Sequence, residues 1–253
     1  MNATNWIVVC ATAMLGLTVT GSAQQTNVEA VAYKIQETRL GPMDEKVLAP
    51  AFSRDGCHLA YVTIRGQKQC VVVDGQAGAE YDGIAAGSLI FDADGKRVAY
   101  AAGKGAKQMV VVDGQAGPEY DGIGKSTLIF SADGKRVAYG AQKGAKRFVV
   151  VDGQAGPEYD GISSLVFSAD GKRVAYGAQK GAKRAVVVLD GEAGPECDGI
   201  GKGTLIFSAD GKRVAYVAQK GAKQVVVVDG QTGPEYDGIR SLTFSADGKR
   251  VAY

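Results

Sequence analysis

The side chains that could perform catalysis are few in this sequence. His58 is the one histidine, and it follows Cys57 directly. A Cys-His or Ser-His-Asp site needs the imidazole beside its nucleophile, whereas adjacent residues of a strand point to opposite faces. We therefore interpret His58 as a surface substitution and expect no catalytic residue. The alternative is a hydrolase or lyase, for which the chain offers the unrepeated polar residues Cys57, His58 and Asp92.

Residues that commonly bind metals do not form a recognisable set. The cysteines lack the CxxC spacing of zinc sites. If the chain turns near Gly66, Cys70 lies opposite Val62 rather than Cys57, so local pairing suggests no disulfide. Aspartates recur before glycine, at Asp55, Asp94, Asp133, Asp170, Asp210 and Asp247. Asp favours turns by hydrogen bonding its own backbone, so we interpret these as turn residues rather than calcium ligands and expect no cofactor.

Basic residues cluster at short glycine-containing segments and form the one candidate binding surface. If these segments are hairpin loops, their cations lie on one rim of the molecule. The candidate residues of this basic rim are Lys104, Lys107, Lys143, Lys146, Arg147, Lys180, Lys183, Arg184, Lys220 and Lys223. Such a rim could bind an anionic polymer or an acidic protein face by additive weak contacts. Alternatively, the lysines only keep the sheet ends soluble and unpaired.

The composition argues against nucleic acid as the partner. Lys and Arg number 29 and Asp and Glu number 27, which leaves a formal net charge of only +2. Bulk charge therefore supplies little attraction for a polyanion. No aromatic residues interleave with the candidate lysines, which disfavours binding of single strands.

An internal repeat positions all of these residues. The phrase Phe-Ser-Ala-Asp-Gly-Lys-Arg-Val-Ala-Tyr begins at Phe130, Phe167, Phe207 and Phe244, with degenerate copies at Phe52 and Phe91. The steps are 39, 39, 37, 40 and 37 residues. A period near 40 is typical of a solenoid, an array or a propeller. One unit carries an extra residue near 186–190, which we interpret as a local bulge.

Each unit contains four short apolar segments, bounded by Asp-Gly, Gly-Pro or other glycine-containing turns. Four antiparallel strands in about 38 residues describe a propeller blade. In the segment 136–141, Val137 and Tyr139 point to one side while Ala138 and Gly140 point to the other. The bulky side of one blade could therefore pack against the small side of the next, and we expect the recurrent tyrosines to be core residues.

The blade count suggests a closed ring. Five full blades cover 48–239, and 240–253 supplies the first two strands of another. Gly41-Pro42 precedes Phe52 as Gly156-Pro157 precedes Phe167, so 31–47 reads as the two missing strands. We therefore expect an all-β, six-bladed β-propeller of four-stranded antiparallel blades, its last blade closed by N- and C-terminal strands. The alternative is a truncated gene whose further blades are missing.

The N-terminal segment has the pattern of a secretory leader. Residues 1–23 contain no Asp, Glu, Lys or Arg, and an apolar run from Ile7 to Val19 precedes Gly21-Ser22-Ala23. A helix of that length spans about 20 Å, less than a hydrocarbon core of about 30 Å. We expect a signal peptide at 1–23, a single β-propeller at 24–253 and a periplasmic or secreted location. The alternative is an uncleaved anchor.

The repeated phrase, for example Phe130 to Tyr139, resembles WD40-like (PD40) propeller repeats, similar to the C-terminal propeller of TolB. Ala132, Ala169, Ala209 and Ala246 stand where those repeats usually have Pro. The resemblance implies the fold, and a role in an envelope complex only by analogy. We expect an exported, monomeric, non-catalytic binding or scaffold module for a protein or an anionic envelope component. We expect no nucleic-acid partner and no membrane span once the leader is removed.

Overall fold

The computed structural model describes the backbone of residues 5–13, 33–42, 46–181 and 184–253, and side chains from residue 46 onward within those ranges. Every regular element in these ranges is a β-strand. No helix in the described part is long and apolar enough to cross a membrane. The predicted all-β class is therefore confirmed.

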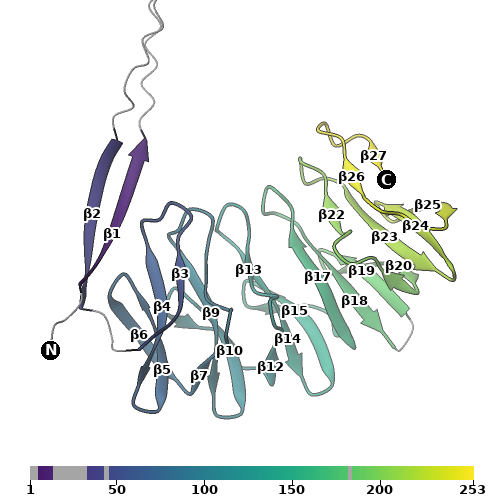
Figure 1. Ribbon diagram of the computed structural model, residues 1–253. Helices are drawn as coiled ribbons and strands as arrows, with labels where there is room; N and C mark the ends of the chain where they lie inside the picture. The colour runs from purple at the N-terminus through teal and green to yellow at the C-terminus, as the bar shows by residue number, and fades with distance from the viewer. Residues whose placement is uncertain (1–4, 14–32, 43–45, 182–183) are drawn as a thin grey trace, which may run out of the picture.

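Five blades follow one another along the chain, each an antiparallel sheet ordered as its strands occur in sequence (Figure 1). The first blade comprises β3 (Val47–Phe52), β4 (Leu59–Arg65), β5 (Lys68–Val73) and β6 (Gln76–Tyr81). The second comprises β7 (Gly83–Ile84), β8 (Ile90–Phe91), β9 (Val98–Lys104), β10 (Lys107–Val112) and β11 (Gln115–Ala116). The third comprises β12 (Gly122–Ile123), β13 (Ile129–Phe130), β14 (Val137–Lys143), β15 (Lys146–Val151) and β16 (Gln154–Ala155).

The fourth blade comprises β17 (Gly161–Phe167), β18 (Val174–Lys180), β19 (Arg184–Leu189) and β20 (Glu192–Cys197). The fifth comprises β21 (Gly199–Ile200), β22 (Ile206–Phe207), β23 (Val214–Lys220), β24 (Lys223–Val228) and β25 (Gln231–Tyr236). In the second, third and fifth blades the first strand is divided into two short pieces that both pair with the second strand. The predicted four-stranded blade is thus the repeating unit of the structure.

Two kinds of turn define the two ends of every blade. At the turn end, uppermost in Figure 1, the first strand leads into the second and the third into the fourth. Asp152 and Gly153 both adopt positive φ there, at 51° and 81°, as a two-residue hairpin with primed turn geometry requires. At the hairpin end, the second strand leads into the third. The Asp-Gly dipeptides therefore fix the strand pairing locally.

The blades pack face to face as predicted, with the bulky side of one blade against the small side of its neighbour. Val137 and Tyr139 of the third blade form one core cluster with Ala99 and Val110 of the second. The same arrangement joins the other consecutive blades, with Tyr100, Tyr176 and Tyr216 in the corresponding clusters. These tyrosines are at most 3% exposed. The prediction that the recurrent tyrosines are core residues is confirmed for these four, because small residues on the facing sheet leave room for the rings, and for Tyr61. It is wrong for Tyr253 of the last unit, which is 47% exposed.

A local bulge was predicted near 186–190, and a register shift does occur between Val186 and Val188 where β19 pairs with β20. The same shift recurs in the first and fifth blades, which lack the extra residue, so the insertion does not cause it. β18 and β19 pair without a register shift from Lys180↔Arg184 to Ala175↔Leu189. In the third blade the same hairpin is closed by Lys143↔Lys146. The insertion therefore lengthens the connection between the paired residues Lys180 and Arg184 by one residue. A turn can lengthen at little cost, whereas a slip would move every buried side chain to the wrong face.

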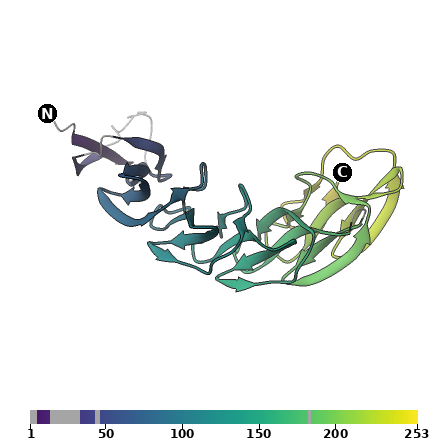
Figure 2. The same cartoon turned by 90° about the horizontal axis from the view of Figure 1, so that it is seen from below.

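The prediction of a closed ring is wrong: the N- and C-terminal strands do not share a blade in this structure. β26 (Thr243–Phe244) and β27 (Val251–Ala252) form a two-stranded sheet without further partners among the described residues. β2 (Tyr33–Pro42), predicted to complete that blade, pairs instead with β1 (Asn5–Ala13), and Ile35 lies opposite Ala11. The blades form an open arc with the β1–β2 hairpin and the C-terminus at opposite ends (Figures 1 and 2).

The pairing of β2 has a local physical reason. Residues 5–13 provide an extended apolar strand close in sequence, so β2 satisfies its backbone without crossing the arc. The predicted split of one blade between 31–47 and 240–253 is accordingly absent, and residues 47–52 belong to the first full blade. Most of the predicted leader lies outside the described residues, and its cleavage stays a prediction.

Candidate functional site

The Asp-Gly turns after the first strands are built as hydrogen-bonded turns, not as an ion site. Asp133 Oδ1 accepts bonds from Ser131 Oγ at 2.7 Å and from the Lys135 amide at 3.2 Å. Ser131 Oγ accepts in turn from the Arg136 amide at 2.9 Å. The Ser131 hydroxyl and the Lys135 amide hold the pKa of Asp133 below its ordinary value. Among the described residues, no group of three His, Cys, Asp or Glu could hold a metal ion.

Each turn also places an arginine that ties its blade to the next. Arg136 Nε donates to Asp152 Oδ2 at 2.8 Å within the third blade. Its Nη1 donates to the Lys172 carbonyl of the fourth blade at 2.7 Å. Its guanidinium lies 5.5 Å from the ring centroid of Phe167, also on the fourth blade. This arrangement, which we call the arginine clamp, recurs around Arg97, Arg136, Arg173 and Arg213.

The residues that could have marked a catalytic site have structural partners. His58 occupies the clamp position of the first blade, with Nδ1 2.6 Å from Asp74 Oδ2 and its ring 6.5 Å from that of Phe91. Asp92 replaces the serine of the other turns, and its Oδ1 accepts from the Arg97 amide at 3.0 Å. Burial raises the pKa of Asp92. Alignment of the repeat units could have predicted these structural roles, because His58 stands where other units carry Arg and Asp92 stands where they carry Ser.

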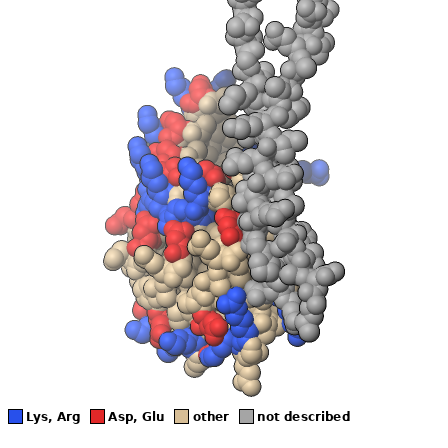
Figure 3. Space-filling view, turned by 90° about the vertical axis from the view of Figure 1, so that its left-hand side faces the viewer, with Lys and Arg blue, Asp and Glu red and all other residues tan. Residues whose placement is uncertain are grey.

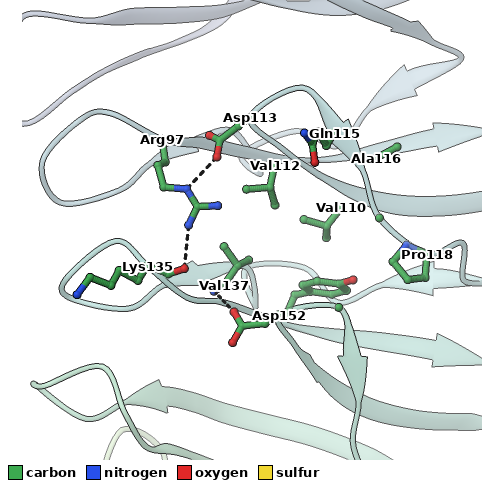
Figure 4. A pocket seen from close by; sticks show the side chains of 13 residues that line it. Arg97, Val110, Val112, Asp113, Gln115, Ala116, Pro118, Lys135, Val137 and Asp152 are labelled. Carbon is green, nitrogen blue, oxygen red and sulfur yellow. Dashed lines mark hydrogen bonds and ion pairs between the residues drawn. The ribbon is translucent and has the colours of Figure 1, made fainter.

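Grooves between successive blades open at the turn end. One lies between the second and third blades, with a volume of about 440 Å³ (Figure 4). Val110, Val112 and Val137 form its apolar part, and Asp113 and Asp152 border it. Equivalent grooves between the third and fourth and between the fourth and fifth blades measure about 350 and 480 Å³. We call these three the inter-blade grooves.

Small residues on the fourth strand of each blade create the inter-blade grooves. Gln115, Ala116 and Gly117 line the first, as Gln154, Ala155 and Gly156 line the second. A Cβ on Gly156 would lie 3.2 Å from the Val149 carbonyl and 3.6 Å from the Tyr176 hydroxyl. The Tyr176 hydroxyl is buried and has no hydrogen-bond partner among the described residues. Sequence reasoning missed these grooves, because each is formed jointly by two blades.

The predicted basic rim is present at the hairpin end, but most of its charge is compensated. Lys107 Nζ lies 2.6 Å from Asp121 Oδ1, and Lys146 Nζ lies 2.7 Å from Asp160 Oδ1. Of the ten predicted residues, ion pairs also engage Lys180, Arg184, Lys220 and Lys223. Lys183 lies outside the described residues. Figure 3 shows basic and acidic side chains interleaved at both ends of the blades, with a largely uncharged band between them.

The acidic partners have a second role, which explains why they stand there. Asp121 Oδ2 accepts from the Gly144 amide of the next blade at 2.6 Å, and Asp160 Oδ2 accepts from the Gly181 amide at 2.7 Å. The Lys107 ammonium and the Gly144 amide hold the pKa of Asp121 below its ordinary value. The lysines therefore support carboxylates that bridge blades. Lys104 and Lys143 form no ion pair in the described part of the chain.

Comparisons with known proteins assign no family to this chain. No protein-family model matches this chain, and no curated protein matches its sequence. The chain is similar to the structure of TolB from Acinetobacter baumannii, at 17% sequence identity and a TM-score of 0.40, over 79% of this chain and 58% of that one. It thus spans little more than half of that TolB chain. It is also similar to the β-propeller domain of the trilobed protease from Pyrococcus furiosus, a domain described as having an open velcro topology. There the identity is 15% and the TM-score 0.39, over 85% of this chain and 74% of that one.

Proposed function

We propose that this protein is an exported, non-catalytic binding scaffold, and that its partner is an extended protein segment lying across the inter-blade grooves. The observation that carries the proposal is the threefold recurrence of one groove, with the same residue types, along one end of the arc. A repeated surface gains affinity from a partner that can fill several sites at once.

The groove lining indicates the chemistry of that segment. Val149, Val151 and Val174 give the second groove an apolar interior that suits aliphatic side chains. Lys135, Lys172 and Lys212 border successive grooves, and their side chains are 81% exposed. They lie 3.4 to 4.0 Å from carboxylates of their own turns, and pairs this exposed contribute little. These lysines are free to contact acidic residues that alternate with the aliphatic ones.

The proposal is tested by filling the grooves and measuring peptide binding. A displayed library of extended peptides that alternate aliphatic and acidic residues supplies the probe. Binding should be lost when Ala116, Ala155 and Ala193, which line the three grooves, are changed to Trp. The matched control is Ala145→Trp, an exposed alanine of a hairpin at the opposite end. A library that yields no binder, or binders indifferent to the groove substitutions, would refute the proposal.

A second set of variants separates the two ends of the molecule. Lys104→Gln and Lys143→Gln remove hairpin-end cations for which the described ranges contain no ion pair. These changes should leave peptide binding intact if the grooves are the contact surface. Binding of an inorganic polyphosphate chain that disappears in the lysine variants, with no peptide binding in the parent protein, would assign the function to the basic rim instead.

A further inference from the structure

Three junctions between blades are filled by a tyrosine from the end of the fourth strand. Tyr81, Tyr120 and Tyr159 are buried. Their rings meet Tyr100, Tyr139 and Tyr176 of the following blade edge to face, at centroid distances of 6.2, 6.3 and 6.3 Å. This is a favourable arrangement for aromatic pairs. The repeat thus shows what a filled junction contains: a phenol ring packed on a second phenol ring.

The junction between the fourth and fifth blades lacks this ring. Cys197 stands at the tyrosine position, and Tyr216 is the ring that the missing tyrosine would contact. A cavity of about 270 Å³ occupies the site, bordered by Cys197, Tyr216, Ala218, Val225 and Val227. The exchange of Tyr for Cys accounts for the cavity, because the surrounding sheets keep the register of the other blades.

A second departure from the repeat borders the same cavity. Thr232 replaces the alanine found at Ala77, Ala116, Ala155 and Ala193. It adds a neutral hydroxyl to the wall, and Gln219 adds an amide. Three charged residues also line the cavity, and each has a partner: Glu196 pairs with Arg184 at 2.8 Å, Lys220 pairs with Glu235 at 2.9 Å, and Asp198 Oδ2 accepts from the Gly221 amide at 2.6 Å. The cavity therefore offers an aromatic and aliphatic wall together with neutral hydrogen-bonding groups.

We propose that this cavity is a binding site for a small neutral phenol, whose ring takes the place that tyrosine holds at the other junctions. The ring packs edge to face on Tyr216, and its polar substituent meets the hydroxyl of Thr232 or the amide of Gln219. A site that a large-to-small exchange leaves unfilled can bind an aromatic molecule on its apolar walls. p-Cresol is the matching probe, since it is the tyrosine side chain as a free molecule.

The thiol forms the wall of the site and does not react with the phenol. Cys197 Sγ donates to the carbonyls of Ala185 and Gly199, at 3.3 and 3.2 Å. Burial raises the pKa of the Cys197 thiol, which keeps it protonated and a poor nucleophile. It can nevertheless report occupancy, because a bound ring covers it. Cys70, which is fully buried, provides an internal reference.

The first experiment measures alkylation of Cys197 by a small neutral reagent, with peptide mapping, in the presence of p-cresol. We expect alkylation to slow about tenfold when p-cresol is at ten times its dissociation constant. The reaction of Cys70 should not change. 4-Methylcyclohexanol, which has a similar size but no aromatic ring, should protect much less. A Cys197 rate that p-cresol leaves unchanged up to its solubility limit would overturn the proposal.

The second experiment uses variants at equivalent positions. Cys197→Tyr fills the cavity, so this variant should unfold at a higher temperature than the parent and lose the thermal shift caused by p-cresol. Tyr159→Cys opens the same cavity one junction earlier and should add a second p-cresol site. A folded Tyr159→Cys protein with no added site, or a Cys197→Tyr protein that still responds, would contradict the assignment. The alkylation experiment decides the question if either variant fails to fold.

Discussion

The arginine clamp makes a quantitative prediction, because the chain contains the same arginine with and without its partners. Arg136 reaches Asp152 in its own blade and the Lys172 carbonyl and Phe167 ring in the next. Arg250 stands at the same position of the last unit, where the described residues give its side chain no partner. The perturbation is Arg136→Ala, with Arg250→Ala as its control.

The expected loss follows from the contacts of Arg136. The ion pair with Asp152 is a third or more exposed on both sides and contributes about 0.5 kcal/mol. The charged hydrogen bond across the blades contributes about 1.5 kcal/mol, and the stacking on Phe167 about 0.5 kcal/mol. Arg136→Ala should therefore lower the free energy of unfolding by about 2–3 kcal/mol. Arg250→Ala should change it by less than about 0.5 kcal/mol.

Urea denaturation followed by circular dichroism measures both variants. Because blades contact mainly their neighbours, weakening one junction can also split the transition into two. Amide hydrogen exchange then shows faster opening of β15 and β18 than of β9. The conservative Arg136→Lys should recover only the ion pair, since an ammonium lacks the planar fork of the guanidinium. Equal effects of Arg136→Ala and Arg250→Ala would refute the clamp as a source of inter-blade stability.

Two further predictions concern substitutions at single positions, and a third concerns the N-terminal hairpin. Burial places the pKa of Asp92 above its ordinary 3.8, so the folded state loses stability as pH rises through that range. Asp92→Ser should therefore raise stability at pH 7 in urea titrations, with a gain that shrinks below about pH 4; a gain independent of pH would contradict the reasoning. Gly171 and Gly153 both have positive φ, but a Cβ on Gly171 would lie 2.9 Å from Asp133 Oδ1, whereas Gly153 has open space around it. In thermal unfolding, Gly171→Ala should cost about 2–3 kcal/mol and Gly153→Ala about 1 kcal/mol; equal losses would show that crowding at Gly171 is unimportant. In a chain that begins at residue 24, β2 lacks β1, so spin labels at Ile35 and Val251 should lie closer together than in the full chain. An unchanged label distance would show that β2 does not seek the last blade.

Much of the architecture could be predicted from the sequence because its determinants are local and periodic. The Asp-Gly dipeptides between the third and fourth strands, such as Asp152-Gly153, accept the positive φ of tight hairpins. The alternation around Tyr139 assigns bulky and small residues to opposite faces of a strand. Both signals act within a few residues, so the blade and its stacking follow directly from the sequence.

The candidate sites depended on contacts between blades, which no local pattern reveals. The lysines of the predicted basic rim are largely paired, because folding brings carboxylates 14 to 16 residues away in the chain beside them: Asp121 and Asp160 at the starts of following blades, and Glu196 and Glu235 within the same blade. Each inter-blade groove is lined from two blades at once, the second by Ala155 and Gly156 of one blade and by Val174 and Tyr176 of the next.

The sequence by itself therefore determined the repeat, the strands, the turns and the buried tyrosines, since each depends on the preferences of neighbouring residues along one strand or hairpin. Only the tertiary structure decided that the arc is open, that Arg136 joins two blades, and that Cys197 leaves a cavity beside Tyr216. The physical reason is distance along the chain. These features depend on which side chains meet after about 40 residues, and packing against a neighbouring sheet, rather than local preference, sets that outcome.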